Sequence, residues 1–318
     1  MSASDTNDRT RRPNRPTKKK RRRQRSRGFW TAPIGGGVIG LSLLLFLVRT
    51  VPRAIESARK ASRPSAKQSA DSAKVRGVSS QQRAQQVDDD LAAAGEAIRL
   101  NPKDADAYRT RGSAWLRKGN DTSALADLNE AIQLDPKDMA AYHLRGIAFL
   151  HQRDFAKASS DLDEAIRLKP TDANLLADRG RVKNFQKQYD QAIADYTAAI
   201  QLDSQNAFAY NGLAWQFATC PVAKYRDGKK AVENASIACK LTEMKQPHFI
   251  GTLAAAHAEA GDFTKATRCQ WLADSLYAPA DKRAWAPMHD LYEAGRPYRD
   301  NGQNSPALRF PSLISAIR

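Results

Sequence analysis

Arginine and aspartate residues recur in this sequence at spacings that favour ion pairs. Both sets repeat with a period of 34 residues, and each aspartate follows an arginine by 16 residues. If every arginine bonded to the preceding aspartate, the first arginine and the last aspartate would have no partner. We therefore predict a structural salt bridge within each 34-residue unit, and no catalytic or binding role for these side chains. The predicted pairs are Arg111–Asp127, Arg145–Asp161 and Arg179–Asp195.

The sequence lacks the motifs of common catalytic sites, with no nucleophile elbow, phosphate-binding loop, HExxH or kinase signature. Its cysteines, Cys220, Cys239 and Cys269, form no CxxC pair and no Cys/His cluster with the spacing of zinc ligands. We therefore expect no enzyme activity, no metal site and no cofactor. Antiparallel packing of consecutive helices would separate Cys220 from Cys239 too far for a disulfide, so we expect free, mostly buried thiols.

The same period organises the elements that must position these residues. The segments LNPKD, LDPKD, LKPTD and LDSQN begin at Leu100, Leu134, Leu168 and Leu202. Within each unit, apolar or small residues at spacings of three and four predict helices with one buried face. The proline in LNPKD, LDPKD and LKPTD ends the second helix of a unit, because the residue before a proline avoids the α region. One hairpin cannot bury its face alone, so the hairpins must stack into a solenoid.

These repeats resemble the tetratricopeptide repeat (TPR) family. In the first full repeat the family's characteristic positions hold Tyr108, Gly112, Trp115, Ala124, Ala131 and Pro136. In the second repeat they hold Tyr142, Gly146, Phe149, Ala158, Ala165 and Pro170. The resemblance implies an all-α helical-hairpin solenoid, of about four to five repeats, that binds a protein or peptide ligand in its concave groove.

The resemblance also implies which side chains line that groove. They are Arg109, Arg117, His143, His151, Arg181, Asn184 and Asn211. Cations and amides suit an acidic peptide or a C-terminal carboxylate. The alternative is that these are solvated residues of the inner face with no ligand.

The domain boundaries follow from composition and from the repeat. We expect a disordered basic tail over residues 1–28, a transmembrane signal anchor over 29–48 and a flexible or partly helical stalk over 49–83. The solenoid covers 84–278 and begins with a lone second helix at Val87–Leu100. A C-terminal capping helix over 279–300, with its amphipathic pattern at 281–294, and a tail over 301–318 follow the solenoid.

The N-terminal quarter holds the whole charge excess, because residues 1–83 contain 21 Lys and Arg against four acids. The stretch 29–48 has 20 uncharged residues, long enough to span a bilayer. The larger number of cations before it predicts a cytoplasmic N-terminus and an extracytoplasmic solenoid. One GxxxG pair, at Gly36 and Gly40, leaves oligomerisation open.

Two other interpretations of this quarter remain. A cleavable signal peptide would need a small-residue cleavage site, and the charged segment RTVPRAIESARK follows the apolar run instead. The basic run Lys18–Arg27 could bind nucleic acid or act as a nuclear signal, although it holds no aromatic residue for base stacking. We therefore expect a membrane-anchored scaffold for protein–protein interactions, with a nucleic-acid-binding or nuclear TPR protein as the alternative.

Overall fold

The computed structural model describes residues 66–277, 279–303 and 305–306, without the side chains of residues 66–80 and 279–284. These residues form twelve α-helices, one short 3-10 helix and no strand, which confirms the expected all-α class. The chain divides into two units, Met1–Ala73 and Lys74–Arg318. The helical hairpins and the side-chain contacts described below belong to the second unit.

Five helical hairpins make up the repeats. They are α3 (Ala105–Lys118) with α4 (Asp121–Leu134), α5 (Met139–His151) with α6 (Phe155–Leu168), α7 (Ala173–Phe185) with α8 (Tyr189–Leu202), α9 (Ala207–Thr219) with α10 (Gly228–Leu241), and α11 (Pro247–Glu259) with α12 (Phe263–Leu276). Helix α2 (Ala66–Leu100) precedes them, the 3-10 helix η1 (Ala223–Tyr225) lies in the longer loop of the fourth hairpin, and α13 (Pro279–Glu293) follows them.

Side-chain caps fix the start of most of these helices. The aspartate that ends each LxPxD segment is the N-cap of the next first helix, so Asp104 accepts a hydrogen bond from the backbone N–H of Ala107. Asp138 does the same for the N–H of Ala141 at the start of α5. The repeated segment therefore ends one helix with its proline and begins the next with its aspartate.

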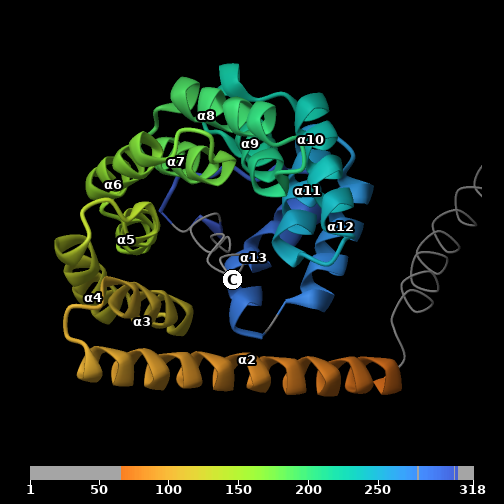
Figure 1. Ribbon diagram of the computed structural model, residues 1–318. Coiled ribbons are helices and arrows are strands. Elements are labelled where there is room, and N and C mark those ends of the chain that lie inside the picture. Colours follow the sequence, from red (N-terminus) through yellow and green to blue (C-terminus); the bar gives the residue numbers. More distant parts are fainter. Residues whose placement is uncertain (1–65, 278, 304, 307–318) are drawn as a thin grey trace, which may run out of the picture. The chain divides into compact units, whose positions relative to one another are not determined.

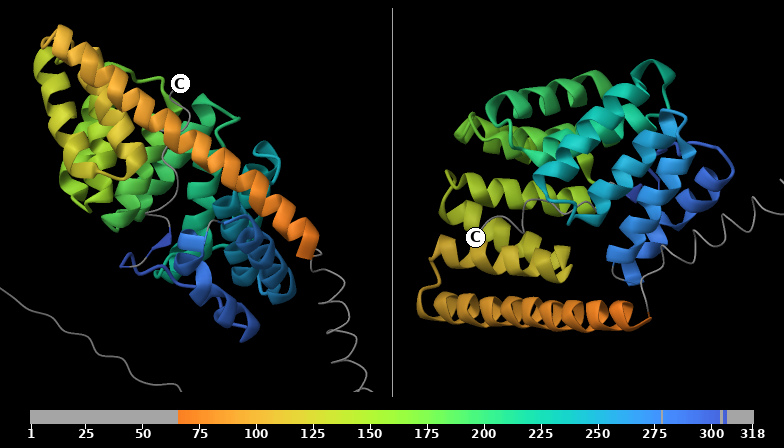
Figure 2. Two further views of the ribbon diagram at one scale, coloured as in Figure 1. Left: turned by 90° about the horizontal axis from the view of Figure 1, so that it is seen from below. Right: turned by 90° about the vertical axis from the view of Figure 1, so that its right-hand side faces the viewer.

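Neighbouring hairpins stack mainly through the second helix of one hairpin and the first helix of the next, as α4 does with α5, α6 with α7, α8 with α9 and α10 with α11. The first helices also contact one another. Helix α3 contacts α5, α5 contacts α7, α7 contacts α9 and α9 contacts α11, in addition to the contacts inside each hairpin. Figure 1 shows these first helices along the inner side of an arc of hairpins, with the second helices outside, and Figure 2 shows the hairpins stacked on one another. This is the arrangement expected of a solenoid, and its inner side is the predicted binding face.

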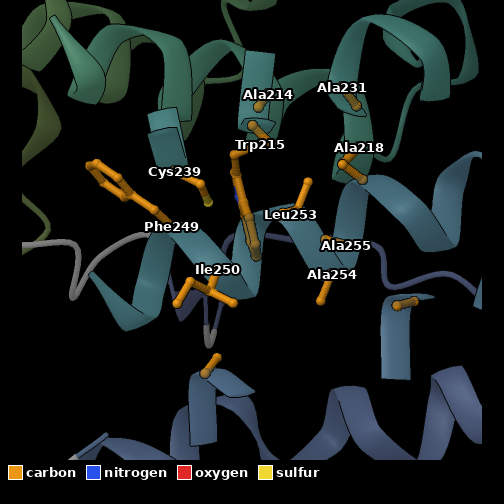
Figure 3. Packing of buried hydrophobic residues seen from close by; sticks show 14 of the residues in the cluster. Ala214, Trp215, Ala218, Ala231, Cys239, Phe249, Ile250, Leu253, Ala254 and Ala255 are labelled. Carbon is orange, nitrogen blue, oxygen red and sulfur yellow. The ribbon is translucent and has the colours of Figure 1, made fainter. Parts of the chain in front are cut away.

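The core of the last hairpins is the largest hydrophobic cluster in the described residues. Trp215 of α9 is almost fully buried among residues of α10 and α11. Figure 3 shows its side chain extending toward Ile250 and Leu253 of α11. The cluster fixes α9 rigidly, so the polar indole N–H of Trp215 has a fixed direction.

Helix α13 packs against α11 and α12 of the final hairpin, and only the first part of the capping segment 279–300 is helical. Its Trp285 ring packs so closely on α11 that a Cβ at Gly251 would lie 2.4 Å from a ring carbon. The amphipathic pattern predicts helix over 281–294 within the capping segment 279–300, and α13 ends at Glu293. Gly295 takes a left-handed conformation with φ 67°, and the N–H of Arg296 bonds back to the carbonyl of Leu291 at 2.8 Å. This glycine termination, followed by Pro297, redirects the chain.

Part of the predicted stalk is helical, because residues 66–83 belong to the continuous helix α2. Alanine, glutamine, lysine and arginine in this stretch are good helix formers, which explains the extension. Among the described residues no helix combines the length and the apolar character needed to cross a bilayer. The predicted tail over 1–28 and anchor over 29–48 lie outside the described residues.

Candidate functional site

The three predicted arginine–aspartate pairs are present, each between the two helices of its own hairpin. In the second hairpin, the Nε and Nη2 atoms of Arg145 each donate to one carboxylate oxygen of Asp161, both at 2.8 Å. Such two-bond pairing fixes the angle between helices as well as their distance. The first and third hairpins repeat it through Arg111–Asp127 and Arg179–Asp195.

Two of these arginines, Arg145 and Arg179, also bond to the hairpin before them, which the sequence pattern did not indicate. The free Nη1 of Arg145 donates to the side-chain oxygen of Asn129 on α4 at 2.8 Å, and that of Arg179 to Asp163 on α6 at 2.9 Å. This second acceptor lies two positions after the recurring aspartate of the preceding hairpin, so it does not belong to the aspartate pattern. These arginines therefore join neighbouring repeats and have a structural role.

The half-exposed basic residues predicted to line the groove have carboxylate partners. Arg109 donates to Asp138, the N-cap of the next hairpin, at 2.6 Å. Arg117 pairs with Asp90 of α2, while Nδ1 of His151 lies 3.0 Å from Asp121 of α4. Each of these basic side chains therefore already has a carboxylate beside it, and an acidic ligand would have to compete with that carboxylate.

Two more predicted groove residues, His143 and Arg181, are buried in a polar cluster between α5 and α7. Nε2 of His143 lies 2.8 Å from one oxygen of Asp178, and Arg181 pairs with the other at 2.9 Å. All three are at most 6 % exposed. Burial alone would raise the pKa of Asp178, but the charge of Arg181 and the hydrogen bond with His143 hold it below its usual value. The cluster therefore joins the second hairpin, through α5, to the third hairpin, through α7.

The predicted amides differ in exposure. Asn184 of α7 is half-buried. Asn211 of α9 is 2 % exposed, and its side-chain oxygen has no hydrogen-bond partner among the described residues. The structure therefore places the seven predicted residues along the inner helices, but it buries His143, Arg181 and Asn211 away from solvent.

The inner face already holds a peptide segment, which the sequence argument placed partly in the capping helix and partly in a tail. After α13 the chain runs back across the C-terminal ends of α9, α11 and α5. Trp215 donates its indole N–H to the carboxylate of Asp300 at 2.8 Å, and the N–H of Asp300 donates to the carbonyl of Thr219 at 2.9 Å. The ring of Tyr298 lies 5.9 Å from that of Trp215. The Gly-Arg-Pro sequence at 295–297 is the signal that could have revealed the return.

Charged groups at both ends hold the same segment. Arg299 pairs with Glu259 at the end of α11 at 2.7 Å. At the other end, Arg153, just after α5, donates to the backbone carbonyls of Gly302 and Gln303 at 2.9 and 3.2 Å. In Figure 1 the blue segment after α13 extends toward α5. The inner face is thus able to hold an extended backbone by side-chain hydrogen bonds.

The cysteines are free, as expected. Cys220 and Cys239 are buried and Cys269 is partly buried. Burial raises the pKa of the Cys239 thiol to about 12, so this sulfur stays protonated and unreactive near neutral pH. Among the described residues no group of His, Cys, Asp and Glu side chains is arranged to hold a metal ion.

Several solved structures share this architecture. The chain matches the crystal structure of the APC/C hetero-tetramer Cut9-Hcn1 with a TM-score of 0.58 and 14% identity, over 65% of this chain and 40% of that one. It matches TTC0263, a TPR protein of Thermus thermophilus, with a TM-score of 0.50 and 16% identity, over 60% and 98% of the two chains. At these identities the likeness shows the fold alone. No curated protein matches the chain.

The family model described as tetratricopeptide repeat matches three overlapping stretches, residues 77–139, 122–173 and 143–207. These stretches cover α3 to α8, where the period of 34 residues is regular and the arginine–aspartate pairs recur. With the repeat, the hairpin geometry and the family match in agreement, residues 77–207 belong to the tetratricopeptide repeat family.

Proposed function

We propose that this protein is a membrane-anchored scaffold that binds extended peptide segments of partner proteins on its concave face. The observation that carries the proposal is the seated segment Tyr298–Gln303, held by Trp215, Glu259 and Arg153 from three hairpins. A face that holds one extended segment through directed hydrogen bonds has the chemistry to hold another.

Site-specific photo-crosslinking in the full-length chain tests this function. A crosslinking residue at Asn184 on inner helix α7 should form adducts with partner proteins, whereas one at the exposed Ser160 on α6 should form few. The matched pair controls for expression and for random collisions. Equal adduct yields at the two positions would remove the basis for a binding role of the concave face.

The anchor is part of the same proposal. The 20 uncharged residues at 29–48, between two basic flanks, support a single span with the N-terminus in the cytoplasm. Replacing Leu44 and Phe46 by lysine should move the protein from the membrane fraction to the supernatant. A C-terminal reporter enzyme that is active only outside the cytoplasm should be active in the native chain, and activity confined to the cytoplasm would reverse the orientation.

Nucleic-acid binding by the basic tail is the competing function, and the 12 Lys and Arg within residues 1–28 are the observation that favours it. It predicts that the peptide 1–28 binds duplex DNA with an affinity that falls steeply between low and physiological salt. Full-length protein that stays with membranes and releases DNA at physiological salt would support the anchor instead.

A further inference from the structure

Three consecutive residues bind to the inner face through two of its side chains: Trp215 contacts Tyr298 and Asp300, and Glu259 pairs with Arg299. We infer that the C-terminal ends of α9 and α11 form a binding site for an extended aromatic–basic–acidic triplet, and that the chain's own Tyr298–Asp300 occupies it as a built-in competitor. This inference rests on the proposed function, because it assumes that partner peptides bind to the same face.

The acidic position is the most specific of the three. Trp215 is 1 % exposed, and its indole N–H is directed at a carboxylate that is itself 9 % exposed. A buried indole donor left without an acceptor is unfavourable, so this position selects for a side-chain oxygen. The carbonyl of Thr219 at the end of α9 accepts the backbone N–H of the same residue, which fixes the direction of the bound chain.

The basic and aromatic positions lie on either side of this contact. Glu259 accepts the guanidinium of Arg299 at 2.7 Å and that of Arg226 at 3.1 Å, so one carboxylate faces two cations. The Tyr298 ring packs at a tilt against Trp215 at 5.9 Å. Such a contact fits any aromatic ring, since offset and tilted arrangements are all favourable.

Beyond the triplet the contacts lose sequence specificity. Arg153 bonds only to the backbone carbonyls of residues 302 and 303, which any peptide provides. Sequence specificity is therefore confined to the three positions of the triplet. The remaining contacts require only an extended backbone. A partner peptide with the same triplet would satisfy the same groups.

The covalent link makes the resident segment an effective competitor. Only Ala294–Pro297 connects α13 to the triplet, and a short link of this kind gives an effective concentration in the millimolar range. A free peptide with the same contacts must therefore exceed that concentration or have a better match. Binding of a partner and release of residues 298–303 become a single exchange equilibrium.

A labelled peptide with the sequence of residues 296–303, RPYRDNGQ, tests this exchange on the detergent-solubilised full-length protein. In the protein, Asp300→Ala removes the main contact of the resident segment and leaves Trp215 and Glu259 unchanged. This variant should bind the peptide at least about tenfold more tightly than the native protein does, since the competitor is weakened. Asn301→Ala, at the exposed neighbouring position, is the matched control and should bind like the native protein.

The probe peptide has its own control, in which alanine replaces its aspartate and binding to every protein variant should be lost. The double variant Asp300→Ala with Glu259→Gln should lose most of the gain, because the basic position is then weakened. If Asp300→Ala keeps its native circular dichroism spectrum and binds the peptide no better than the native protein, residues 298–303 are a fixed structural cap and the inference is wrong.

Hydrogen exchange on the native protein provides a readout that needs no variant. The amides of Asp300 and Gly302 are hydrogen-bonded to the carbonyl of Thr219 and to the Asp300 carboxylate. Excess peptide should accelerate their exchange severalfold, and unchanged protection at saturating peptide would overturn the inference. If crosslinks form at Asn184 but the triplet peptide displaces nothing, the concave face binds partners elsewhere and only the inference fails.

Discussion

The pairing of Arg145 with Asp161 predicts an asymmetric response to truncation of its two members. Asp161 is only 7 % exposed at its side chain, whereas Arg145 is 20 % exposed and has a second acceptor in Asn129. Arg145→Ala therefore leaves a buried carboxylate without its partner. Asp161→Ala leaves a cation that still reaches Asn129 and water. We expect the first variant to be the less stable of the two.

The magnitudes follow from the geometry. A hydrogen bond to a charged group contributes about 1.5–3 kcal/mol net, and two parallel bonds here share one partly solvated guanidinium. Because the guanidinium is partly solvated, the summed contribution of the two hydrogen bonds is reduced, and we expect a coupling energy of about 1–2 kcal/mol between Arg145 and Asp161. Arg145→Ala should cost about 2–4 kcal/mol, because an uncompensated carboxylate stays buried, and Asp161→Ala about 1–2 kcal/mol.

Urea unfolding of the two single variants and the double variant gives this coupling as a double-mutant cycle. Circular dichroism and tryptophan fluorescence should be followed together, because solenoid repeats do not always unfold in one step. The exposed pair Arg167–Glu164, one turn apart on α6, is the control in the same hairpin, and it should show no measurable coupling. A coupling for Arg145–Asp161 no larger than that of the control would refute the reasoning.

Three further predictions concern packing, protonation and reactivity. In thermal melts, Gly251→Ala should destabilise the protein by about 1–3 kcal/mol, because the added Cβ would meet the Trp285 ring. Gly95→Ala in α2 has open space around its Cβ and should be neutral or stabilising in the same assay. Burial lowers the pKa of His248 to about 3 from its usual 6.5, so the unfolded chain binds a proton that the folded chain excludes, and stability should fall as pH drops through 6.5 toward 3. His248→Gln should reduce this slope by up to about 1.4 kcal/mol per pH unit in acid-denaturation curves, and an unchanged slope would exclude the imidazole as its source. Iodoacetamide at pH 8 should leave Cys239 unmodified in the native protein and modify it in denaturant, as measured by mass spectrometry. Rapid labelling of Cys239 in the native protein would contradict its burial.

Much of the fold could be derived from the sequence because the structure is periodic. Small residues such as Gly146 and Ala158 recur at positions where two helices of a hairpin touch, so one repeat predicts the next. The end of α13 could also be predicted, because the amphipathic pattern stops near residue 294 and Gly295 then takes a left-handed conformation. Helix propensity carries α2 through residues 66–83 of the predicted stalk.

The candidate site was predicted less well, because its contacts are not periodic. His143 and Arg181 are inner-face residues by position, yet both turn toward Asp178, which the repeat pattern gives no reason to expect there. The contact of Trp215 with Asp300 joins residues 85 positions apart and occurs in no other repeat of the described chain. Exposure of an inner-face side chain depends on such partners, which helical periodicity cannot specify.

The sequence by itself determined the hairpin register, the family and the pairing of Arg111, Arg145 and Arg179 with aspartates of their own hairpins, since these depend on spacings within 34 residues. Only the tertiary structure decided which inner-face groups meet solvent and which meet the chain's own C-terminal segment. The physical reason is that side-chain burial and hydrogen bonding are set by whatever packs on a face. On this face that is a non-repeating segment, brought back by Gly295 and held by Trp215, Glu259 and Arg153.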